Sequence, residues 1–368
     1  MILVIDYNLK ELKIWSFKED GEKSPDSFLI KDVEEIRDNE SLKRCIRGIA
    51  GKDQIKAFAF RVLSGGDYFL KPAIVNSAFL GKFEKLIDFL PFYIPSMLEI
   101  IKRFRDTFKN TPIINFFETS FFSNLPDEEK YYALPFEYYK NSRIKKFGFH
   151  GIFHEANSRI VPLEDKVISI VFDKQTTVCA IHNRRPLSIS LGYTPLEGIM
   201  SRRACGDLDP GIVFNLMNIH KFSIYEIDEM LKNNSGFLGL TGYDLELGDM
   251  LKLYGKDPQV DLAFDVYKAQ ILKHIGEGIS VMGGLDSVVI SGDNAAIFTP
   301  VIYNILKSIS FLGINIERLP WSGDKELIRI TSEESKVRAY INRMSLSKVI
   351  FCETANLLRK SPSKHPDL

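Results

Sequence analysis

The sequence predicts an α/β fold made of two similar domains. Residues 2–5 and 12–17 have the pattern of two strands joined by a short turn, and residues 167–172 and 178–182 repeat that pattern near the middle of the chain. Residues 287–291 form an almost unbroken apolar run, which is typical of a parallel strand buried on both faces. A repeated strand pair combined with buried parallel strands indicates a duplicated α/β domain.

Composition limits the function classes. The chain has 368 residues, with 48 Lys and Arg against 48 Asp and Glu, so its formal net charge is zero. Nothing global attracts nucleic acid or an anionic membrane, and we expect neither as a partner. Met1 to Asp6 resembles a strand with an early acid rather than a signal peptide. The four cysteines are widely scattered, which is typical of reduced thiols in a cytoplasmic protein.

The first half alternates between strands and helices. Apolar spacing predicts further strands at 57–63 and 111–117 and helices at 41–49, 82–89 and 96–108. The aromatic segments 125–132 and 136–140 have no clear period, and we expect irregular structure there.

The second half contains the longest helical pattern. Residues 261–282 carry apolar side chains at the spacing of one buried helix face. Ser223 and Glu226 have capping-box spacing, so residues 226–232 are predicted to be helical. Further helices are predicted at 155–160, 211–220, 300–312 and 348–358, and a glycine-rich loop at 234–242.

The stretch from 190 to 211 contains the most specific sequence motif in the chain. Gly192, Pro195 and Gly198 favour a tight, irregular path after a short strand. Asp209 followed by Pro210 is a typical helix start, with an N-cap acid and a proline at the first helical position. A polar loop that leads into a helix N-terminus is suited to binding an anion.

These residues resemble the acetate kinase family, which phosphorylates short carboxylic acids with ATP. Residues 192–198 read Gly-Tyr-Thr-Pro-Leu-Glu-Gly, and residues 206–211 read Gly-Asp-Leu-Asp-Pro-Gly. Three further matches are Lys-Phe-Gly-Phe-His-Gly at 146–151, Gly-Gly-Leu-Asp at 283–286 and Arg-Val-Leu-Ser-Gly-Gly at 61–66. The matches follow the family's order and cover nearly the whole chain.

The resemblance implies an organisation as well as an activity. It implies two duplicated ribonuclease H-like domains of the actin-like ATPase type, with a nucleotide cleft between them. We expect an N-terminal domain at 1–145, closed by a C-terminal helix at about 346–360, and a C-terminal domain at 146–345. Residues 361–368 are expected to be a disordered tail. The family further implies ATP and Mg²⁺ as cofactors, a small carboxylate or phosphate ligand, and a homodimer formed through the second domain.

Family positions map onto candidate acceptor and catalytic residues. Arg61 matches the arginine that binds the substrate carboxylate, and a guanidinium fork suits a planar carboxylate. His150 matches the histidine that contacts the transferring phosphoryl group. Tyr93 stands in place of a family histidine beside the substrate, and Glu118 stands in place of a family aspartate. The catalytic arginine of the family falls on Ala204, so Arg203 is the candidate replacement.

The nucleotide turns depart most from the family pattern. The first turn replaces Asn-Ala-Gly-Ser-Ser-Ser with residues 6–11, the second replaces Leu-Gly-Asn-Gly with residues 172–175, and the third replaces a Gly-Ile-Gly turn with residues 292–297. Bulk or negative charge at Leu9, Glu11 and Asp173 disfavours bound phosphate, since glycine is what permits close backbone approach. The candidate cofactor-binding residues are Asp6, Lys10, Lys13, Lys174, Gly292, Asp293 and Asn294, with Asp6 also the candidate metal ligand.

Three hypotheses follow. In the first, the chain is an ATP:carboxylate phosphotransferase with weak or lost catalysis. In the second, it is a non-catalytic relative that acts as a binding or regulatory dimer without cofactors. In the third, it is a phosphotransferase with a different donor or acceptor. The changes concentrate on the three phosphate turns and on the family's magnesium glutamate, whose place near 345–348 holds no acid. That concentration favours loss of ATP turnover over full activity.

Overall fold

The computed structural model describes residues 1–9, 11–18, 23–31, 33–36, 38–91, 93–317 and 325–360. The chain divides into two compact units, which are described separately. Unit 1 contains Met1–Ser123 and the C-terminal segment from Ser345, and unit 2 contains Asn124–Met344. Among the described residues, no helix is both long enough and apolar enough to span a membrane.

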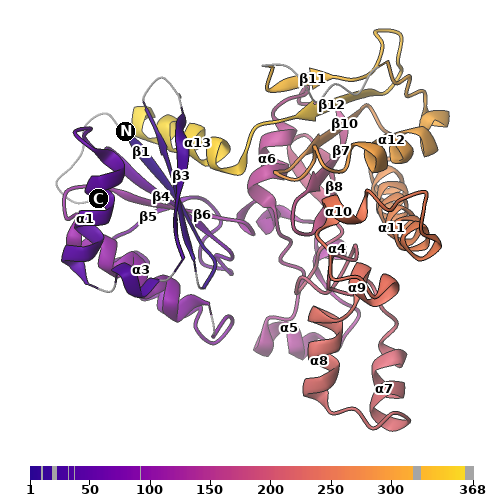
Figure 1. Cartoon of the computed structure of the whole chain (residues 1–368), viewed down its shortest axis with the longest axis horizontal. Coiled ribbons are helices and arrows are strands. Elements are labelled where there is room, and N and C mark those ends of the chain that lie inside the picture. Colours follow the sequence, from indigo (N-terminus) through magenta and orange to yellow (C-terminus); the bar gives the residue numbers. More distant parts are fainter. Residues whose placement is uncertain are drawn as a thin grey trace. The chain divides into compact units, whose positions relative to one another are not determined.

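Unit 1, whose sheet is drawn at the left of Figure 1, is built on a six-stranded mixed sheet with the order β3-β2-β1-β4-β6-β5. Its strands β1, β4 and β6 are parallel, whereas β2, β3 and β5 pair antiparallel to their neighbours. The strands are β1 (Ile2–Tyr7), β2 (Leu12–Phe17), β3 (Lys23–Ile30), β4 (Ala57–Val62), β5 (Ala73–Ile74) and β6 (Ile113–Phe117).

Helices cover both faces of the unit 1 sheet. On one face, α1 and α3 pack over a core that includes Leu3 and Ile5. On the other face, α13 packs against β1 and β4, and Phe351 stacks on Phe17 with ring centroids 4.7 Å apart. The helices are α1 (Asn39–Ala50), α2 (Ser77–Glu84), α3 (Ile94–Thr107) and α13 (Leu346–Lys360), with short 3-10 turns at Val33–Ile36 and Ser120–Asn124.

Unit 2 repeats the same strand order. Its sheet runs β9-β8-β7-β10-β12-β11, in which β7, β10 and β12 are parallel and β8, β9 and β11 are antiparallel to their neighbours. The two sheets are therefore topologically equivalent, which confirms the predicted duplicated α/β architecture. The strands are β7 (Lys166–Phe172), β8 (Thr176–His182), β9 (Arg185–Ile189), β10 (Ser287–Ser291), β11 (Leu327–Arg329) and β12 (Arg338–Asn342).

The unit 2 sheet also has a helix on each face. The short α6 packs on β7 and β10, and the long α11 packs on β8, β9 and β7. Alternation along β7 places Ile168 and Ile170 in the core under α11 and Ser169 on the α6 side. The helices are α4 (Asp127–Lys130), α5 (Phe136–Ser142), α6 (Gly151–Ser158), α7 (Pro210–Asn218), α8 (Ile224–Asn233), α9 (Gly236–Thr241), α10 (Leu247–Met250), α11 (Pro258–Met282) and α12 (Thr299–Ser308), with a 3-10 turn at Ser310–Leu312.

Several local predictions differ from the structure. The helix predicted at 82–89 begins at Ser77, because the Asn76 side chain caps it by accepting the Phe79 N–H at 2.8 Å. The segment 136–140 is helical rather than irregular, and α9 occupies much of the glycine-rich loop at 234–242. The capping box of Ser223 and Glu226 is present as predicted.

The division between the units also differs from the predicted boundary at residue 145. Residues 124–145 belong to unit 2, because their polar groups pair with later strands and loops of that unit. Lys146 N–H donates to the Lys130 carbonyl at 2.9 Å, and Ile189 N–H donates to the Glu129 carboxylate at 3.2 Å. The predicted tail at 361–368 lies outside the described residues.

Candidate functional site

The parallel strands of unit 1 bring three predicted site residues together. Asp6 and Arg61 are register partners near the carboxyl ends of β1 and β4, and Glu118 directly follows β6. Parallel neighbours end at the same edge of a sheet, so their last side chains meet. The Arg61 guanidinium donates from Nε to Glu118 Oε1 at 2.6 Å and from Nη1 to Asp6 Oδ2 at 3.2 Å.

Glu118 is the most deeply buried member of this trio, with 1% of its side chain exposed. Its second carboxylate oxygen, Oε2, is buried and has no hydrogen-bond partner among the residues that the structure describes. Buried polar atoms are nearly always paired, so an orphaned carboxylate oxygen is a sign of a functional position. One guanidinium between two carboxylates leaves the trio with one net negative charge, which weakens its attraction for an anionic acceptor.

Tyr93 and Lys13 lie beside the same sheet. The Tyr93 hydroxyl accepts the Leu63 N–H at 3.2 Å, just past the end of β4, and burial raises the pKa of Tyr93. Tyr93 is therefore a neutral hydrogen-bonding group next to the Arg61 strand. Lys13 on β2 is the register partner of Asp6 on β1, and the Lys13 ammonium lies 5.1 Å from the ring centroid of Trp15.

In the first nucleotide turn, Asn8 and Glu11 form hydrogen bonds with each other. Asn8 N–H donates to the Glu11 carbonyl at 3.2 Å, and Glu11 N–H donates to Asn8 Oδ1 at 3.0 Å. Leu9 occupies the left-handed region with φ 74°, where a branched side chain is strained. The backbone N–H groups of Asn8 and Glu11 are thus paired within the turn, which makes these two donors less available to a phosphate. Lys10 lies outside the described residues.

The second half of the predicted site is in unit 2, around His150. His150 caps α6 in the left-handed region, with φ 60°, and its Nδ1 lies 3.1 Å from Thr177 Oγ1. Its Nε2 lies 3.9 Å from Asp173 Oδ2, in the turn between β7 and β8. The imidazole edge that would face a phosphoryl group is thus close to a carboxylate, which repels anionic phosphate oxygens.

The turn after β10 lies against the turn after β7. Gly292 has φ 111°, and a Cβ added there would approach the Phe172 carbonyl oxygen to 2.1 Å. Asn294 N–H also donates to the Phe172 carbonyl at 3.1 Å. The structure therefore places the segment that contains Gly292, Asp293 and Asn294 next to the turn that carries Asp173 and Lys174.

Arg203 forms an ion pair within unit 2, and its catalytic role stays a prediction. Its guanidinium pairs with the Asp244 carboxylate, which also accepts from Arg202 at 2.7 Å. Arg202 makes a further ion pair with Glu246 at 3.1 Å and donates to the Leu245 carbonyl at 2.9 Å. The described side-chain hydrogen bonds and ion pairs of both arginines are with residues 244–246, which the sequence analysis did not identify as their partners.

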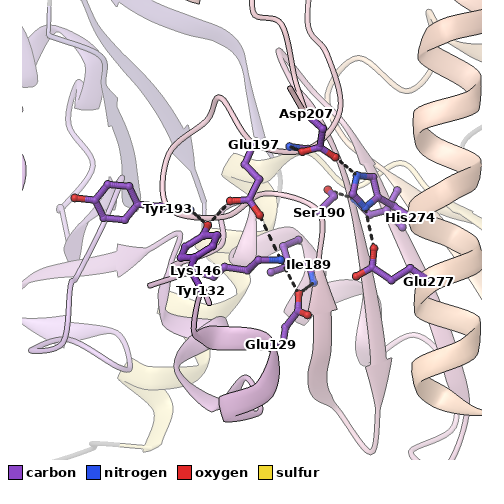
Figure 2. Close-up of polar contacts among 12 residues, drawn as sticks. Glu129, Tyr132, Lys146, Ile189, Ser190, Tyr193, Glu197, Asp207, His274 and Glu277 are labelled. Carbon is purple, nitrogen blue, oxygen red and sulfur yellow. Dashed lines mark hydrogen bonds and ion pairs between the residues drawn. The ribbon is translucent and has the colours of Figure 1, made fainter. Parts of the chain in front are cut away.

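A cluster of charged and polar side chains contacts the loop at 190–211 through Glu197 (Figure 2). The Lys146 ammonium lies 3.1 Å from Glu129 Oε1 and 3.4 Å from Glu197 Oε1, and the Tyr132 hydroxyl donates to Glu197. Burial alone would lower the pKa of Lys146, but the two carboxylates raise it, so the ammonium stays charged. Tyr193 N–H completes the cluster by donating to the Tyr132 oxygen at 2.9 Å.

A histidine fixes the other end of this loop. Asp207 Oδ1 accepts the Gly198 N–H at 2.6 Å, and its Oδ2 lies 3.4 Å from His274 Nε2 (Figure 2). The other imidazole nitrogen lies 3.3 Å from the Glu277 carboxylate. Burial opposes the charged imidazole, but these two carboxylates raise the pKa of His274 to about 9. His274 is therefore a cation at neutral pH, and its ion pair with Asp207 links the 190–211 loop to α11.

Among the described residues, no group of three or more His, Cys, Asp or Glu side chains is arranged to hold a metal ion. Asp6, the predicted metal ligand, contacts Arg61 instead. Its role as a metal ligand stays a prediction.

Comparison with known proteins identifies one family over nearly the whole chain. The profile described as the acetokinase family matches residues 8–351. An acetate kinase from Dictyoglomus thermophilum is 30% identical over 323 residues, which cover 85% of this chain and 80% of the relative. An acetate kinase from Clostridium novyi is 27% identical over 324 residues, covering 86% of this chain and 81% of the relative.

Solved structures agree on the fold. An acetate kinase from Porphyromonas gingivalis superposes with a TM-score of 0.88 at 22% identity, covering 97% of this chain and 99% of that one. An acetate kinase from Entamoeba histolytica has a TM-score of 0.85 at 24% identity over 97% of this chain and 99% of that one. At these identities the likeness establishes the fold alone.

Proposed function

Because the chain belongs to the acetokinase family, we propose that it is an acetate kinase-like phosphotransferase, with a carboxyl group as acceptor, whose turnover of ATP is weak or lost. The observation that carries this proposal is the carboxylate of Asp173, 3.9 Å from His150 Nε2. A phosphoryl group beside His150 would meet this negative charge at close range. The hydrogen bonds between Asn8 and Glu11 support the same conclusion, because phosphate binding depends on available backbone donors.

The residues that would act on substrate can still be assigned roles. Arg61 would orient the acceptor carboxylate, with Glu118 and Asp6 fixing the plane of its guanidinium. His150 would donate a hydrogen bond to the transferring group. Bound Mg²⁺-ATP would supply the phosphoryl group, but the phosphate turns of this chain are poorly suited to hold it.

The test is a titration of the purified protein with Mg²⁺-ATP by calorimetry, alongside an assay for acetyl phosphate. We expect binding weaker than micromolar and formation of acetyl phosphate at a low or undetectable rate. Micromolar binding together with rapid formation of acetyl phosphate would overturn the proposal of impaired turnover. Replacement of ATP by other phosphate donors in the same assay tests whether the donor, rather than the activity, has changed.

A non-catalytic role as a binding dimer is the second candidate. Large apolar side chains are exposed on and beside α7 and α8, with Phe214 at 62% and Tyr225 at 84%. Exposed apolar patches commonly mark association surfaces. We propose that the protein is a cytoplasmic homodimer that uses this part of unit 2. A monomer mass in light scattering would contradict the dimer.

A further inference from the structure

A buried chain of hydrogen bonds runs from the backbone of Met344 to the candidate catalytic histidine, entirely within unit 2. It links six side chains from α6, β7, β8 and β12, all with at most 9% of their surface exposed. Its members, in order from Met344, are Asn342, Asn157, Ser169, His154, Thr177 and His150. We propose that this chain has a single direction of hydrogen donation and that it fixes His150 in the neutral form with its proton on Nε2.

The direction is set at the backbone end. Met344 N–H can only donate, and it donates to Asn342 Oδ1 at 3.1 Å. This contact assigns the Asn342 amide, so its nitrogen faces Asn157 Oδ1 at 3.1 Å. The Asn157 amide is then assigned as well, and its two hydrogens go to Ser169 Oγ at 2.9 Å and Ser291 Oγ at 2.8 Å.

The hydroxyl of Ser169 carries the direction onward. It accepts from Asn157, and its other contact is His154 Nδ1 at 2.8 Å. Within the described residues these are its only two hydrogen-bond partners, so the Ser169 hydrogen has one acceptor, His154 Nδ1. His154 is fully buried, and burial lowers its pKa well below the usual value. A neutral imidazole that accepts at Nδ1 carries its proton on Nε2.

Thr177 repeats the step. His154 Nε2–H donates to Thr177 Oγ1 at 2.9 Å, and the other contact of Thr177 Oγ1 is His150 Nδ1 at 3.1 Å. Over the described part of the chain, the Thr177 hydroxyl has no third hydrogen-bond partner, so it donates to His150 Nδ1. A neutral His150 must therefore carry its proton on Nε2, the nitrogen on the Asp173 side.

The consequence for function rests on the proposed phosphotransferase role of His150. An imidazole that presents Nε2–H is a neutral hydrogen-bond donor to an anionic oxygen, whereas the opposite tautomer presents a lone pair and repels it. Asn342, Asn157, Ser169, His154 and Thr177 are on this view positioning residues that act through His150.

One substitution should reverse the whole chain. In Asn342→Asp, an ionised carboxylate accepts from both Met344 N–H and Asn157, so the Asn157 amide must turn over. Ser169 then donates to Asn157, His154 donates from Nδ1 to Ser169, and Thr177 donates to His154. His150 is left to donate from Nδ1 to Thr177, so its neutral proton moves to Nδ1.

The tautomer is measured directly by long-range proton–nitrogen NMR on the full-length protein with ¹⁵N-labelled histidine. The protein has six histidines, and loss of one signal set in His150→Gln assigns the residue. Spectra are recorded from pH 6 to 9. We expect the Nε2–H pattern in the wild type, the Nδ1–H pattern in Asn342→Asp, and a mixture of the two in Thr177→Val.

The control is Ser188→Ala, which removes a buried hydroxyl on β9 outside the chain of hydrogen bonds and should leave the His150 pattern unchanged. The proposal is overturned by an Nδ1–H pattern in the wild type, by the same tautomer in the wild type and Thr177→Val, or by an imidazolium that persists to pH 9. If Asn342→Asp does not fold, Ser169→Ala interrupts the same chain and should also produce a mixture. Because the readout is a tautomer, loss of the proposed kinase activity does not affect it.

Discussion

The two units have the same strand order, but the polar groups associated with their parallel strands differ. In unit 1, Asp6, Arg61 and Glu118 form a charged trio at the ends of β1, β4 and β6. In unit 2, the equivalent strands β7, β10 and β12 contribute the uncharged Ser169, Ser291 and Asn342, joined through Asn157. A duplicated scaffold thus supports a trio of paired charges in one unit and a neutral hydrogen-bonded chain in the other.

This difference shows how each unit holds its candidate site residue. Arg61 is oriented by Coulomb attraction, which is strong in a partly buried setting but depends on charge balance. His150 is oriented by neutral hydrogen bonds, whose direction depends on connectivity rather than on charge. The two kinds of support should therefore respond differently to substitution and to pH.

The largest effect is expected from removing the cation of the charged trio. Arg61→Met leaves Glu118 buried without its counter-ion, so the free energy of unfolding should fall by about 3–5 kcal/mol. Urea denaturation measures this change. The double variant Arg61→Met/Glu118→Gln removes both charges and should recover most of the loss.

The matched control is Lys102→Met, which breaks the exposed ion pair with Glu84 and should cost less than about 1 kcal/mol. Equal losses in Arg61→Met and Lys102→Met would show that the stability of unit 1 does not depend on the ion pairs of Arg61 with Asp6 and Glu118.

The second largest effect is expected from His274, whose ion pairs with Asp207 and Glu277 lie at and beside the 190–211 loop of unit 2. The pKa of His274 is about 9 in the folded protein against roughly 6.5 when unfolded. Its charged form therefore contributes stability that is fully present below about pH 6.5 and is lost as the pH rises through about 9. Relative to the wild type, His274→Gln should be less stable by about 2–3 kcal/mol at pH 6 and nearly equal above pH 9.5.

Urea denaturation across this pH range tests the prediction. A stability difference that stays constant from pH 6 to 10 would rule out a charged His274.

The smallest expected effect concerns the carboxylate beside His150. Asp173→Gly removes the negative charge and restores a residue type without a Cβ, so the affinity for Mg²⁺-ATP should rise about tenfold, or about 1.4 kcal/mol. Calorimetry measures the change. Asp228→Asn, on the exposed face of α8, should leave the affinity unaltered. If both variants bind ATP as the wild type does, Asp173 is not what limits nucleotide binding.

Sequence patterns predicted the architecture well where they were long and regular. The helix expected at 261–282 appears as α11, and the apolar strands at 57–63 and 287–291 appear as β4 and β10. Short or edge strands such as β5 and β11 were missed, because two or three residues carry no measurable period. The helix expected at 82–89 was displaced because the cap at Asn76 decided where it begins.

The site was only partly predictable. Asp6, Arg61 and Glu118 meet because parallel strands end at one edge, which a sequence pattern can indicate. The pairing of Arg203 with Asp244 depends on how two loops meet in space, and no local pattern encodes it. The hydrogen-bonded chain behind His150 was missed for the same reason, since Thr177, Asn157 and Asn342 come from three separate elements.

The position of α13 has a consequence for biosynthesis. Unit 2 is continuous in sequence, so all of it emerges from the ribosome before residue 345, whereas unit 1 needs α13, the last described helix, to cover β1 and β4. Until α13 has emerged, that face of the unit 1 sheet, including Phe17, lacks its cover. We therefore expect unit 1, whose synthesis begins before that of unit 2, to complete its folding after unit 2. We also expect nascent chains that are stalled before α13 to depend on chaperones that shield an exposed sheet face.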